Sequence, residues 1–465
     1  MKPVIIKKLC LSLLLLFTVN SIHAHKTPHS FKAPPAPSNT SAAWAMWCHA
    51  NGDNSLADFI DFNTSNMASA KLTDQTLIVV QADRPVDVGT YRYRVEKNKV
   101  SLIEHLSYEM GQRPGQEIID GISWFKSKYA FNNLILNLWG HGSGIMDPVR
   151  RLKHHRGILF DDTNNTYLDN QNLSIVMDGI AGSLGKPIDI FGTDACLMGG
   201  IEVGWQIKNS VKILVASETT EPGSGWDYAP FLNAIANKPT MASEDVAKEI
   251  VKAYGAFYKK DTSPYTLSAM NLSKLPDVVQ GLHSIIDNIK ICMQKDARNT
   301  LIAIMSARAL SLQMDENSYI DLISFLTALN KQLSRMKIRS FDEHHTNATL
   351  NAQDLDIVQD LDIIVEDTRM VISDVISYFT DPQETRAFKD DVSKLVRAID
   401  TTIKAVSQAI IANAAGNGMN QAKGMTIYFP PARTPIHPSY PKTKFAKETR
   451  WMQEFLIGIL GYQKS

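Results

Sequence analysis

The sequence predicts an α/β fold, with a mainly parallel sheet flanked by helices and a largely helical C-terminal region. Apolar runs of strand length alternate with amphipathic helical stretches between about residues 42 and 271, the spacing typical of β-α-β units. From about residue 297 to 415, helical periodicity continues almost without interruption. With 465 residues and 44% hydrophobic content, the chain is long enough for one large core or two domains.

The strands and helices of the α/β part are expected in a regular order. The expected strands are Ala42–His49, Leu77–Gln81, Leu134–Trp139, Ile188–Gly192 and Val211–Ala216, with Arg92–Ser101 as a hairpin arm and Thr266–Asn271 and Gly424–Phe429 as further candidates. The expected helices are Leu56–Ala70, Glu117–Tyr129, Leu173–Leu184 and Ser243–Phe257. In the second of these, Ile118, Ile119, Ile122 and Phe125 are expected on one side, as in a helix that packs on a core.

Four parts are predicted along the chain: a signal peptide over 1–24, a flexible lead over 25–41, an α/β domain over 42–296, and a helical region over 297–465. The lead contains prolines and serines and is expected to lack regular structure. The C-terminal region is expected to return the strand at about 424–429 to the core. Within it, Asp354–Asp367 mixes acids with apolar residues and is interpreted as an amphipathic helix with a solvated acidic face.

The first residues have the pattern of a secretory signal. Lys2, Lys7 and Lys8 form a basic start, and Leu9–Val19 is an apolar run that is short for a membrane span. A small residue, Ala24, offers a cut site. The sequence therefore predicts a secreted or periplasmic protein with no stable membrane anchor; an uncleaved anchor is the alternative.

Charge and cysteine usage exclude two classes of protein. The formal net charge is zero, which gives no electrostatic argument for nucleic-acid binding. Cys10, Cys48, Cys196 and Cys292 are the four cysteines, and cleavage of the signal leaves three, so the chain is not a disulfide-stapled scaffold. An odd thiol in an exported protein indicates a reactive cysteine. Cys48 and Cys292 are interpreted as buried apolar residues, with a disulfide between them left open.

Two short motifs carry the predicted chemistry. Leu138–Gly144 places His141 between two glycines, and Thr193–Gly199 places Cys196 just after an aspartate. Each motif follows an apolar run, and ligands of parallel sheets bind beyond the carboxyl ends of the strands. Neighbouring strands lie about 4.8 Å apart, so the two side chains are expected to flank one substrate bond as base and nucleophile.

The backbone of the same motifs is a candidate oxyanion site. Glycines beside His141 would let a peptide backbone pass close to the loop. The amides of Gly142 and Cys196 are candidate donors to an oxyanion, where a lost donor costs about 3 kcal/mol in the barrier. A serine hydrolase fits poorly, because neither Gly140–Gly144 nor Pro222–Gly225 has the Gly-x-Ser-x-Gly spacing.

On these motifs the chain resembles the clostripain family of cysteine peptidases, in the clan of caspases, legumains and gingipains. The resemblance runs from about Ala42 to the C-terminus and rests on Gly52–Leu56, Asn137–Gly144, Arg156–Asp162, Asp194–Met198 with Glu202, Ser217–Glu218, Gly225–Tyr228 and Gly424–Pro430. It implies a caspase-like catalytic domain, a dyad of His141 and Cys196 without an evident third residue, an acyl-enzyme, and cleavage after a basic residue.

Asp194 is the predicted determinant of substrate preference. It lies two residues before Cys196, so an extended strand puts both on one side. A carboxylate there would pair with an arginine or lysine of the substrate, an assignment that the resemblance supports. The alternative is an aspartate that ties down the following turn through backbone amides. Ser217, Glu218 and Asp227 are further candidates to line the substrate cleft.

A basic loop, Pro148–Arg156, follows the predicted catalytic histidine. It is either a solvated, mobile loop or a self-processing site, because an enzyme that cuts after basic residues would find targets there. The candidate processing positions are Arg150, Arg151, Lys153 and Arg156.

No metal site is assigned and no cofactor is expected to be required. His154, His155, Asp161 and Asp162 cluster in the sequence, but they mix donors that suit zinc with donors that suit calcium. Calcium is compatible with the family resemblance, although no residue pattern places it.

The sequence thus predicts an exported, Arg/Lys-directed cysteine endopeptidase that acts as a monomer on peptides or proteins. The alternatives are a catalytically silent peptide-binding protein of the same fold, and an amidase or transpeptidase that uses the same dyad.

Overall fold

The computed structural model describes residues 41–85, 90–147, 157–342 and 382–464. The predicted signal peptide, nearly all of the predicted lead, the basic loop 148–156 and the acidic stretch 354–367 lie outside the described residues. The predicted leader and lead therefore stay predictions.

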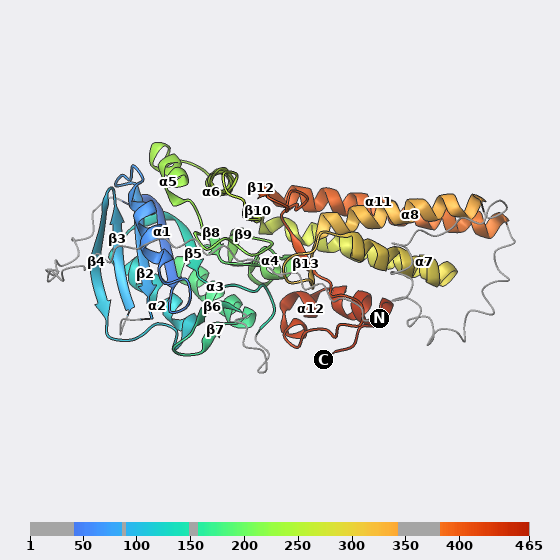
Figure 1. Ribbon diagram of the computed structural model, residues 1–465, viewed down its shortest axis with the longest axis horizontal. Helices are drawn as coiled ribbons and strands as arrows, with labels where there is room; N and C mark the ends of the chain where they lie inside the picture. The colour runs from blue at the N-terminus through green and yellow to red at the C-terminus, as the bar shows by residue number, and fades with distance from the viewer. Residues whose placement is uncertain (1–40, 86–89, 148–156, 343–381, 465) are drawn as a thin grey trace, which may run out of the picture. The chain divides into compact units, whose positions relative to one another are not determined.

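The described residues form a nine-stranded sheet in the order β12-β10-β9-β8-β5-β1-β2-β3-β4 (Figure 1). Its five central strands are parallel, and the pairings toward both edges are antiparallel. The strands are β1 (Ala42–Asn51), β2 (Thr76–Asp83), β3 (Thr90–Glu96), β4 (Lys99–Leu106), β5 (Phe131–Trp139), β8 (Ile188–Asp194), β9 (Val211–Ala216), β10 (Tyr265–Asn271) and β12 (Ile410–Gly416). The predicted α/β class with a mainly parallel central sheet is confirmed.

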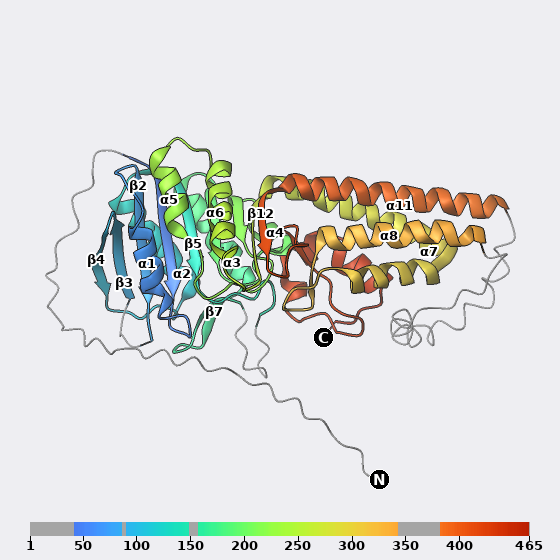
Figure 2. The ribbon, with the colours of Figure 1, turned by 45° about the horizontal axis from the view of Figure 1, so that its top comes forward.

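Two hydrophobic cores lie on the two faces of this sheet. In β1, Trp47 belongs to one core, whereas Trp44 and Met46 belong to the other, as the two-residue period of a strand requires. The first core is covered by α2 (Pro114–Lys128), α3 (Asn170–Leu184) and α4 (Ile201–Ile207). The second is covered by α1 (Phe59–Ala68), α5 (Tyr228–Asn237) and α6 (Ser243–Tyr258), which lie together on one face in Figure 2.

Three long helices follow the sheet: α7 (Leu275–Leu310), α8 (Leu322–Asp342) and α11 (Pro382–Ala409). They run side by side in both views and pack on one another (Figures 1 and 2). Helix α7 continues across the predicted boundary at 296/297, with a local break in helical geometry at Asp296.

The C-terminal part adds to the sheet a strand that the sequence did not predict, whereas the strand predicted at 424–429 reaches the first core with Ile427, Tyr428 and Phe429. The helical stretch ends at residue 409, and β12 joins β10 as an edge strand. The predicted strand at 424–429 is β13 (Thr426–Tyr428), which pairs with β11 (Tyr319–Asp321) in a separate two-stranded sheet. Another small sheet joins β6 (Ile158–Asp161) and β7 (Thr166–Leu168). Short apolar runs do not reveal which partner strand they will pair with.

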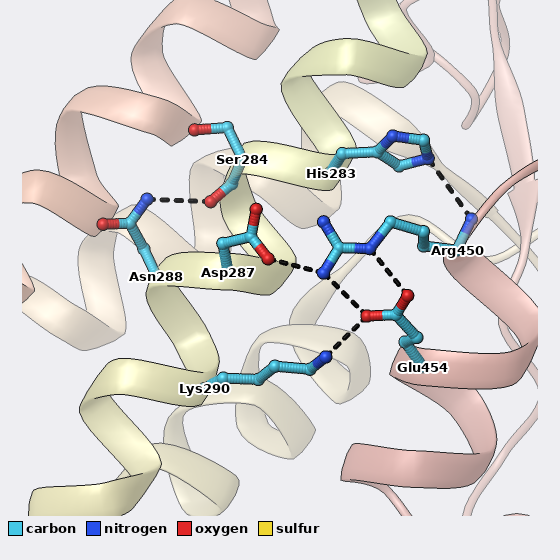
Figure 3. A network of polar contacts seen from close by, with 7 residues as sticks. All are labelled: His283, Ser284, Asp287, Asn288, Lys290, Arg450 and Glu454. Carbon is cyan, nitrogen blue, oxygen red and sulfur yellow. Dashed lines mark hydrogen bonds and ion pairs between the residues drawn. The ribbon is translucent and has the colours of Figure 1, made fainter.

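A short 3-10 helix, η1 (Leu272–Lys274), links β10 to α7. The last residues form η2 (Tyr440–Lys442), α12 (Lys444–Glu448) and a π-helix, η3 (Trp451–Ile459). A polar network fastens the start of η3 to α7 (Figure 3). Arg450 pairs with Asp287 and Glu454, Glu454 also pairs with Lys290, and the Arg450 amide donates to His283 Nε2 at 3.2 Å.

Cys48 and Cys292 are buried free thiols in different cores, so the disulfide that the sequence left open does not form. None of the helices in the described part of the chain is long and apolar enough to cross a bilayer.

Candidate active site

The pairing of β5 with β8 places the two predicted catalytic residues at the same level of one sheet edge. Trp139 of β5 is in register with Asp194 of β8, and the Gly140 amide donates to the Asp194 carbonyl at 3.2 Å. His141 and Cys196 each lie two residues beyond this register pair. The loops that carry them therefore leave adjacent parallel strands side by side.

Gly142 brings the two loops into direct contact. A Cβ atom at this position would lie 2.5 Å from the Cys196 carbonyl oxygen and 3.2 Å from the Cys196 amide nitrogen. No side chain fits there without a backbone shift, so the histidine loop lies against the cysteine turn only because residue 142 is glycine. The backbones of Gly142 and Cys196, the two predicted oxyanion donors, therefore lie close together.

His141 is held from two sides. Its Nε2 lies 3.1 Å from the hydroxyl oxygen of Ser55, an exposed residue in the turn that follows β1. Its carbonyl accepts a hydrogen bond from the Leu159 amide in β6 at 3.0 Å. Ser55 is a contact of the histidine that sequence reasoning missed, although the segment Gly52–Leu56 carried part of the family resemblance.

Cys196 sits in a tight turn immediately after β8 and is partly exposed. Its Sγ accepts a hydrogen bond from the Glu221 amide at 3.3 Å. The next residue, Leu197, has φ of 65°, a left-handed conformation that a leucine rarely adopts. Two backbone bonds hold this turn, from the Leu197 amide to the Thr219 carbonyl and from the Gly199 amide to the Ser217 carbonyl.

The surroundings of Cys196 disfavour its thiolate form in the free protein. Burial raises its pKa above the ordinary value, and the negative charges of Asp315 and Asp194 raise it further, whereas the Glu221 amide lowers it. Because the thiolate is the nucleophile, the thiol must lose its proton when substrate binds.

Asp194 lies below the cysteine turn and is only 5% exposed. Its Oδ2 accepts hydrogen bonds from the Trp226 amide at 3.1 Å and the Tyr228 hydroxyl at 2.5 Å. A Cβ atom on Gly225 would lie 2.7 Å from its Oδ1, so the loop that follows β9 folds closely over this carboxylate. The sequence left open that Asp194 binds backbone amides of the turn that follows it. The amide that it binds is instead that of Trp226, in the loop after β9.

A second carboxyl group, Glu221, lies beside Asp194, and sequence reasoning missed it. Burial raises the pKa of Asp194 to about 6, although hydrogen bonds from the Tyr228 hydroxyl and the Trp226 amide lower it. Burial, and then the charge of Asp194, raises the pKa of Glu221 well above its ordinary value. Burial and mutual repulsion therefore both disfavour the state in which the two carboxyl groups are charged together.

Ser217 and Glu218 are buried, although the sequence predicts that they line the substrate cleft. Both are at most 1% exposed. The Ser217 hydroxyl lies 2.8 Å from that of Thr266, and Glu218 Oε2 accepts a hydrogen bond from the Gly424 amide at 2.8 Å. The C-terminal segment thus lies against Glu218, and β10 lies against Ser217. Asp227 accepts a hydrogen bond from the Asn66 side chain at 3.0 Å.

Comparison with known proteins identifies the family. A sequence profile of the clostripain family matches residues 48–456. The chain belongs to the clostripain family. Clostripain from Hathewaya histolytica is 26% identical over 164 residues, an alignment that spans 31% of this chain and 31% of that protein.

Two solved structures are similar over most of their length. One is a secreted C11 cysteine protease from Bacteroides thetaiotaomicron in complex with an irreversible peptide inhibitor, with a TM-score of 0.55 at 16% identity, covering 87% of this chain and 97% of that one. The other is an inactive zymogen C11 protease from Parabacteroides distasonis, with a TM-score of 0.53 at 15% identity, covering 91% and 99%. At these identities the likeness shows the shared fold.

The remaining predicted positions divide between described and undescribed residues. Arg150, Arg151, Lys153 and Arg156, the candidate processing positions of this family member, lie outside the described residues, as do His154 and His155. Of the mixed metal cluster weighed from sequence, Asp161 instead lies among three other carboxylates, and Asp162 donates its amide to the Asp53 carbonyl at 2.9 Å.

Proposed function

We propose that this clostripain-family chain is a cysteine endopeptidase that cleaves after arginine or lysine, with Cys196 as nucleophile and His141 as general acid and base. The observation that carries the proposal is the contact made by Gly142. It sets the histidine loop against the cysteine turn at equal distances beyond two adjacent strands. A peptide-binding protein without turnover has no need of this pair in this register.

The residues in place support an acyl-enzyme mechanism. Cys196 passes its proton to His141 and attacks the scissile carbonyl carbon, so that a carbon–sulfur bond forms and the carbonyl oxygen becomes an oxyanion. The amides of Gly142 and Cys196 donate to that oxyanion. Collapse of the intermediate breaks the carbon–nitrogen bond, and His141 gives its proton to the leaving amine. His141 then takes a proton from water, which attacks the acyl group and releases Cys196.

The preference for a basic residue rests on Asp194 and Glu221. A buried pair that carries one negative charge matches one guanidinium or ammonium group, and a charge-assisted pair is strong when water is excluded. The charge of Asp194 also contributes to the raised pKa of the Cys196 thiol, after burial and the charge of Asp315. A bound substrate cation would screen this charge and so favour the thiolate. The pKa of Cys196, measured with and without an arginine analogue, should fall on binding; an unchanged value would exclude this activation.

Fluorogenic peptides test the proposal directly. Two peptides that differ only in the residue before the scissile bond, Arg or Asp, are incubated with the protein and with Cys196→Ala under reducing conditions. Turnover of the Arg peptide alone, absent in Cys196→Ala, is the expected result. No turnover of either peptide, even after trypsin treatment, would favour the silent peptide-binding alternative. Transfer of the acyl group to an added amine, without hydrolysis, would favour a transpeptidase.

Self-processing between residues 147 and 156 belongs to the same proposal. The loop holds four basic residues and follows the proposed catalytic histidine closely in the sequence. One structural relative is an inactive zymogen. Fragments of the wild-type protein should end at Arg150, Arg151, Lys153 or Arg156, and Cys196→Ala should stay intact. Cleavage of both proteins at these positions would exclude self-processing.

Export through a cleaved leader is also proposed, and one structural relative is a secreted protease. N-terminal sequencing of the mature protein should start at residue 25; a chain that retains residues 1–24 would contradict cleavage.

A further inference from the structure

A hairpin that belongs to the C-terminal region lies against both proposed catalytic loops. Residues 312–321 connect α7 to α8, include β11, and fold back on themselves through antiparallel backbone hydrogen bonds. Tyr319 of this hairpin contacts the histidine loop, and Asp315 contacts the loop after β9. We infer that Tyr319 and Asp315 are positioning residues, through which the 312–321 hairpin aligns His141 with Cys196 for catalysis.

The Tyr319 hydroxyl binds the backbone of the histidine loop three times. It donates to the Ser143 carbonyl at 2.9 Å and accepts from the Ile145 amide at 3.0 Å and the Met146 amide at 3.2 Å. One donated and two accepted bonds use the full capacity of a hydroxyl group. Since Tyr319 is only 3% exposed, bulk water does not compete for these bonds. The position of the hydroxyl therefore fixes the position of the loop.

Gly144 brings the histidine loop into contact with both the hairpin and the cysteine turn. Its φ of 67° is in the left-handed region that favours glycine. A Cβ atom at this position would lie 2.7 Å from the Tyr319 hydroxyl oxygen and 2.9 Å from the Leu197 carbonyl oxygen. A shift of the hydroxyl would therefore change how His141, three residues earlier, lies relative to Cys196.

Asp315 connects the same hairpin to the nucleophile. Its Oδ2 accepts hydrogen bonds from the Thr219 hydroxyl at 2.8 Å and the Thr220 amide at 3.1 Å. The Thr219 carbonyl accepts the amide of the residue that follows Cys196, and the Glu221 amide donates to Cys196 Sγ. The carboxylate thus holds the short segment that supports the cysteine turn.

Asp315 also acts on Cys196 through its charge. Burial raises the pKa of Asp315, but the hydrogen bonds from Thr220 and Thr219 outweigh it and lower this pKa below its ordinary value. The carboxylate is therefore ionised at neutral pH. After burial, its charge is the first contribution to the raised pKa of the Cys196 thiol. Asp315 thus has two separable effects: its oxygens hold the loop, and its charge opposes the thiolate.

The inference rests on the proposed function, because it concerns the alignment of a nucleophile with its general base. A displacement of about 1 Å between reacting groups costs on the order of 100-fold in rate. Tyr319 binds the loop of His141, whereas the proposed contact with the substrate cation is made by Asp194. Loss of the Tyr319 hydroxyl should therefore lower kcat and leave KM almost unchanged.

Tyr319→Phe tests this expectation. The ring stays packed near Tyr428, at 6.3 Å between ring centres, and only the hydroxyl is removed. We expect kcat to fall about 10- to 100-fold, with KM within about twofold of the wild-type value. Tyr462→Phe is the matched control, because it removes a buried hydroxyl that donates to the Pro430 carbonyl at 2.6 Å. A wild-type kcat in Tyr319→Phe, or an equal loss in Tyr462→Phe, would overturn the inference.

The two effects of Asp315 are separated by two variants. Asp315→Asn keeps an oxygen that can accept both hydrogen bonds but carries no charge, so the Cys196 thiolate is favoured. Alkylation of Cys196 by iodoacetamide should then have its midpoint at a lower pH than in the wild-type protein. Asp315→Ala loses the bonds as well and should have a kcat about tenfold below that of Asp315→Asn. An unchanged midpoint in Asp315→Asn, or equal kcat values in the two variants, would contradict this role.

Hydrogen exchange tests the contact without any turnover. In full-length Cys196→Ala protein, the added change Tyr319→Phe should speed exchange of the amides at 143–146 about tenfold or more, and Tyr462→Phe should not. Unchanged exchange in Tyr319→Phe would overturn the inference. Faster exchange in Tyr319→Phe, combined with a wild-type protein that cleaves no peptide, would instead refute the proposed function and leave the contact between hairpin and loop supported.

Discussion

Replacing Glu202 by glutamine is expected to stabilise the folded protein above pH 7 and to leave its stability near pH 4.5 almost unchanged. Glu202 lies in the first turn of α4 and is 1% exposed. Its Oε1 accepts hydrogen bonds from the Tyr428 amide at 2.8 Å and the Tyr440 hydroxyl at 3.4 Å. Its Oε2 has no hydrogen-bond partner among the described residues.

Burial determines both the sign and the size of the effect. It raises the pKa of Glu202 from 4.5 to about 7, although the Tyr428 amide lowers it. Since the folded protein holds this proton more tightly than the unfolded chain, stability falls as the pH rises from about 4.5 through about 7. At 1.36 kcal/mol per pKa unit, the loss is about 3 kcal/mol. A glutamine keeps the acceptor for Tyr428 and never ionises, so the variant escapes this loss.

Urea unfolding at pH 4.5, 6 and 8, in the Cys196→Ala background, measures the free energy of unfolding of both proteins. The difference between Glu202→Gln and its parent should grow with pH. Glu454→Gln is the control, because Glu454 is ion-paired with Arg450, which lowers its pKa to about 2. This substitution should not raise the free energy of unfolding at pH 8. A difference between Glu202→Gln and its parent that is constant with pH would refute the burial argument.

Three further variants address the active site. Gly142→Ala should lower kcat/KM about 100-fold because its Cβ would meet the backbone of the cysteine turn; Gly182→Ala, with nothing within 4 Å, is the control and should be fully active. Asp194→Asn should lower kcat/KM for an arginine peptide about 100-fold. The kcat/KM of the wild-type protein should rise with pH through about 6, as Asp194 ionises, and this rise should be absent in Asp194→Asn. Ser55→Ala should lower kcat up to about tenfold by freeing His141; an unchanged kcat would remove Ser55 from the mechanism.

The central strands, and the position of the proposed catalytic pair at one edge of the sheet, could be predicted from the sequence because each depends on local pattern. Strands buried on both faces are nearly continuous apolar runs, as in Leu134–Trp139 and Ile188–Gly192. The offset of His141 and Cys196 from the ends of those runs then placed them at one edge. Only the register of Trp139 with Asp194 had to come from the structure.

The features that could not be predicted arise between distant segments. Glu221 carries no motif of its own, and only the fold of the loop after β9 brings it beside Asp194. Asp53, Asp83, Glu109 and Asp161 form a cluster of carboxyl groups. They come from four separate segments, so no spacing in the sequence indicates the cluster. Glu218 ends up buried because Gly424, more than 200 positions later, covers it.

The C-terminal segment has a consequence for the order in which this protein becomes functional. The Thr426 amide donates to the Gly199 carbonyl in the cysteine turn, and the Tyr428 amide donates to Glu202 directly after it. These partners lie more than 220 positions after the turn that they support. A nascent or truncated chain that ends before residue 426 contains both proposed catalytic residues but lacks these partners, so the cysteine turn gains its full support only once they have been synthesised. Translation itself thereby delays the completion of this turn.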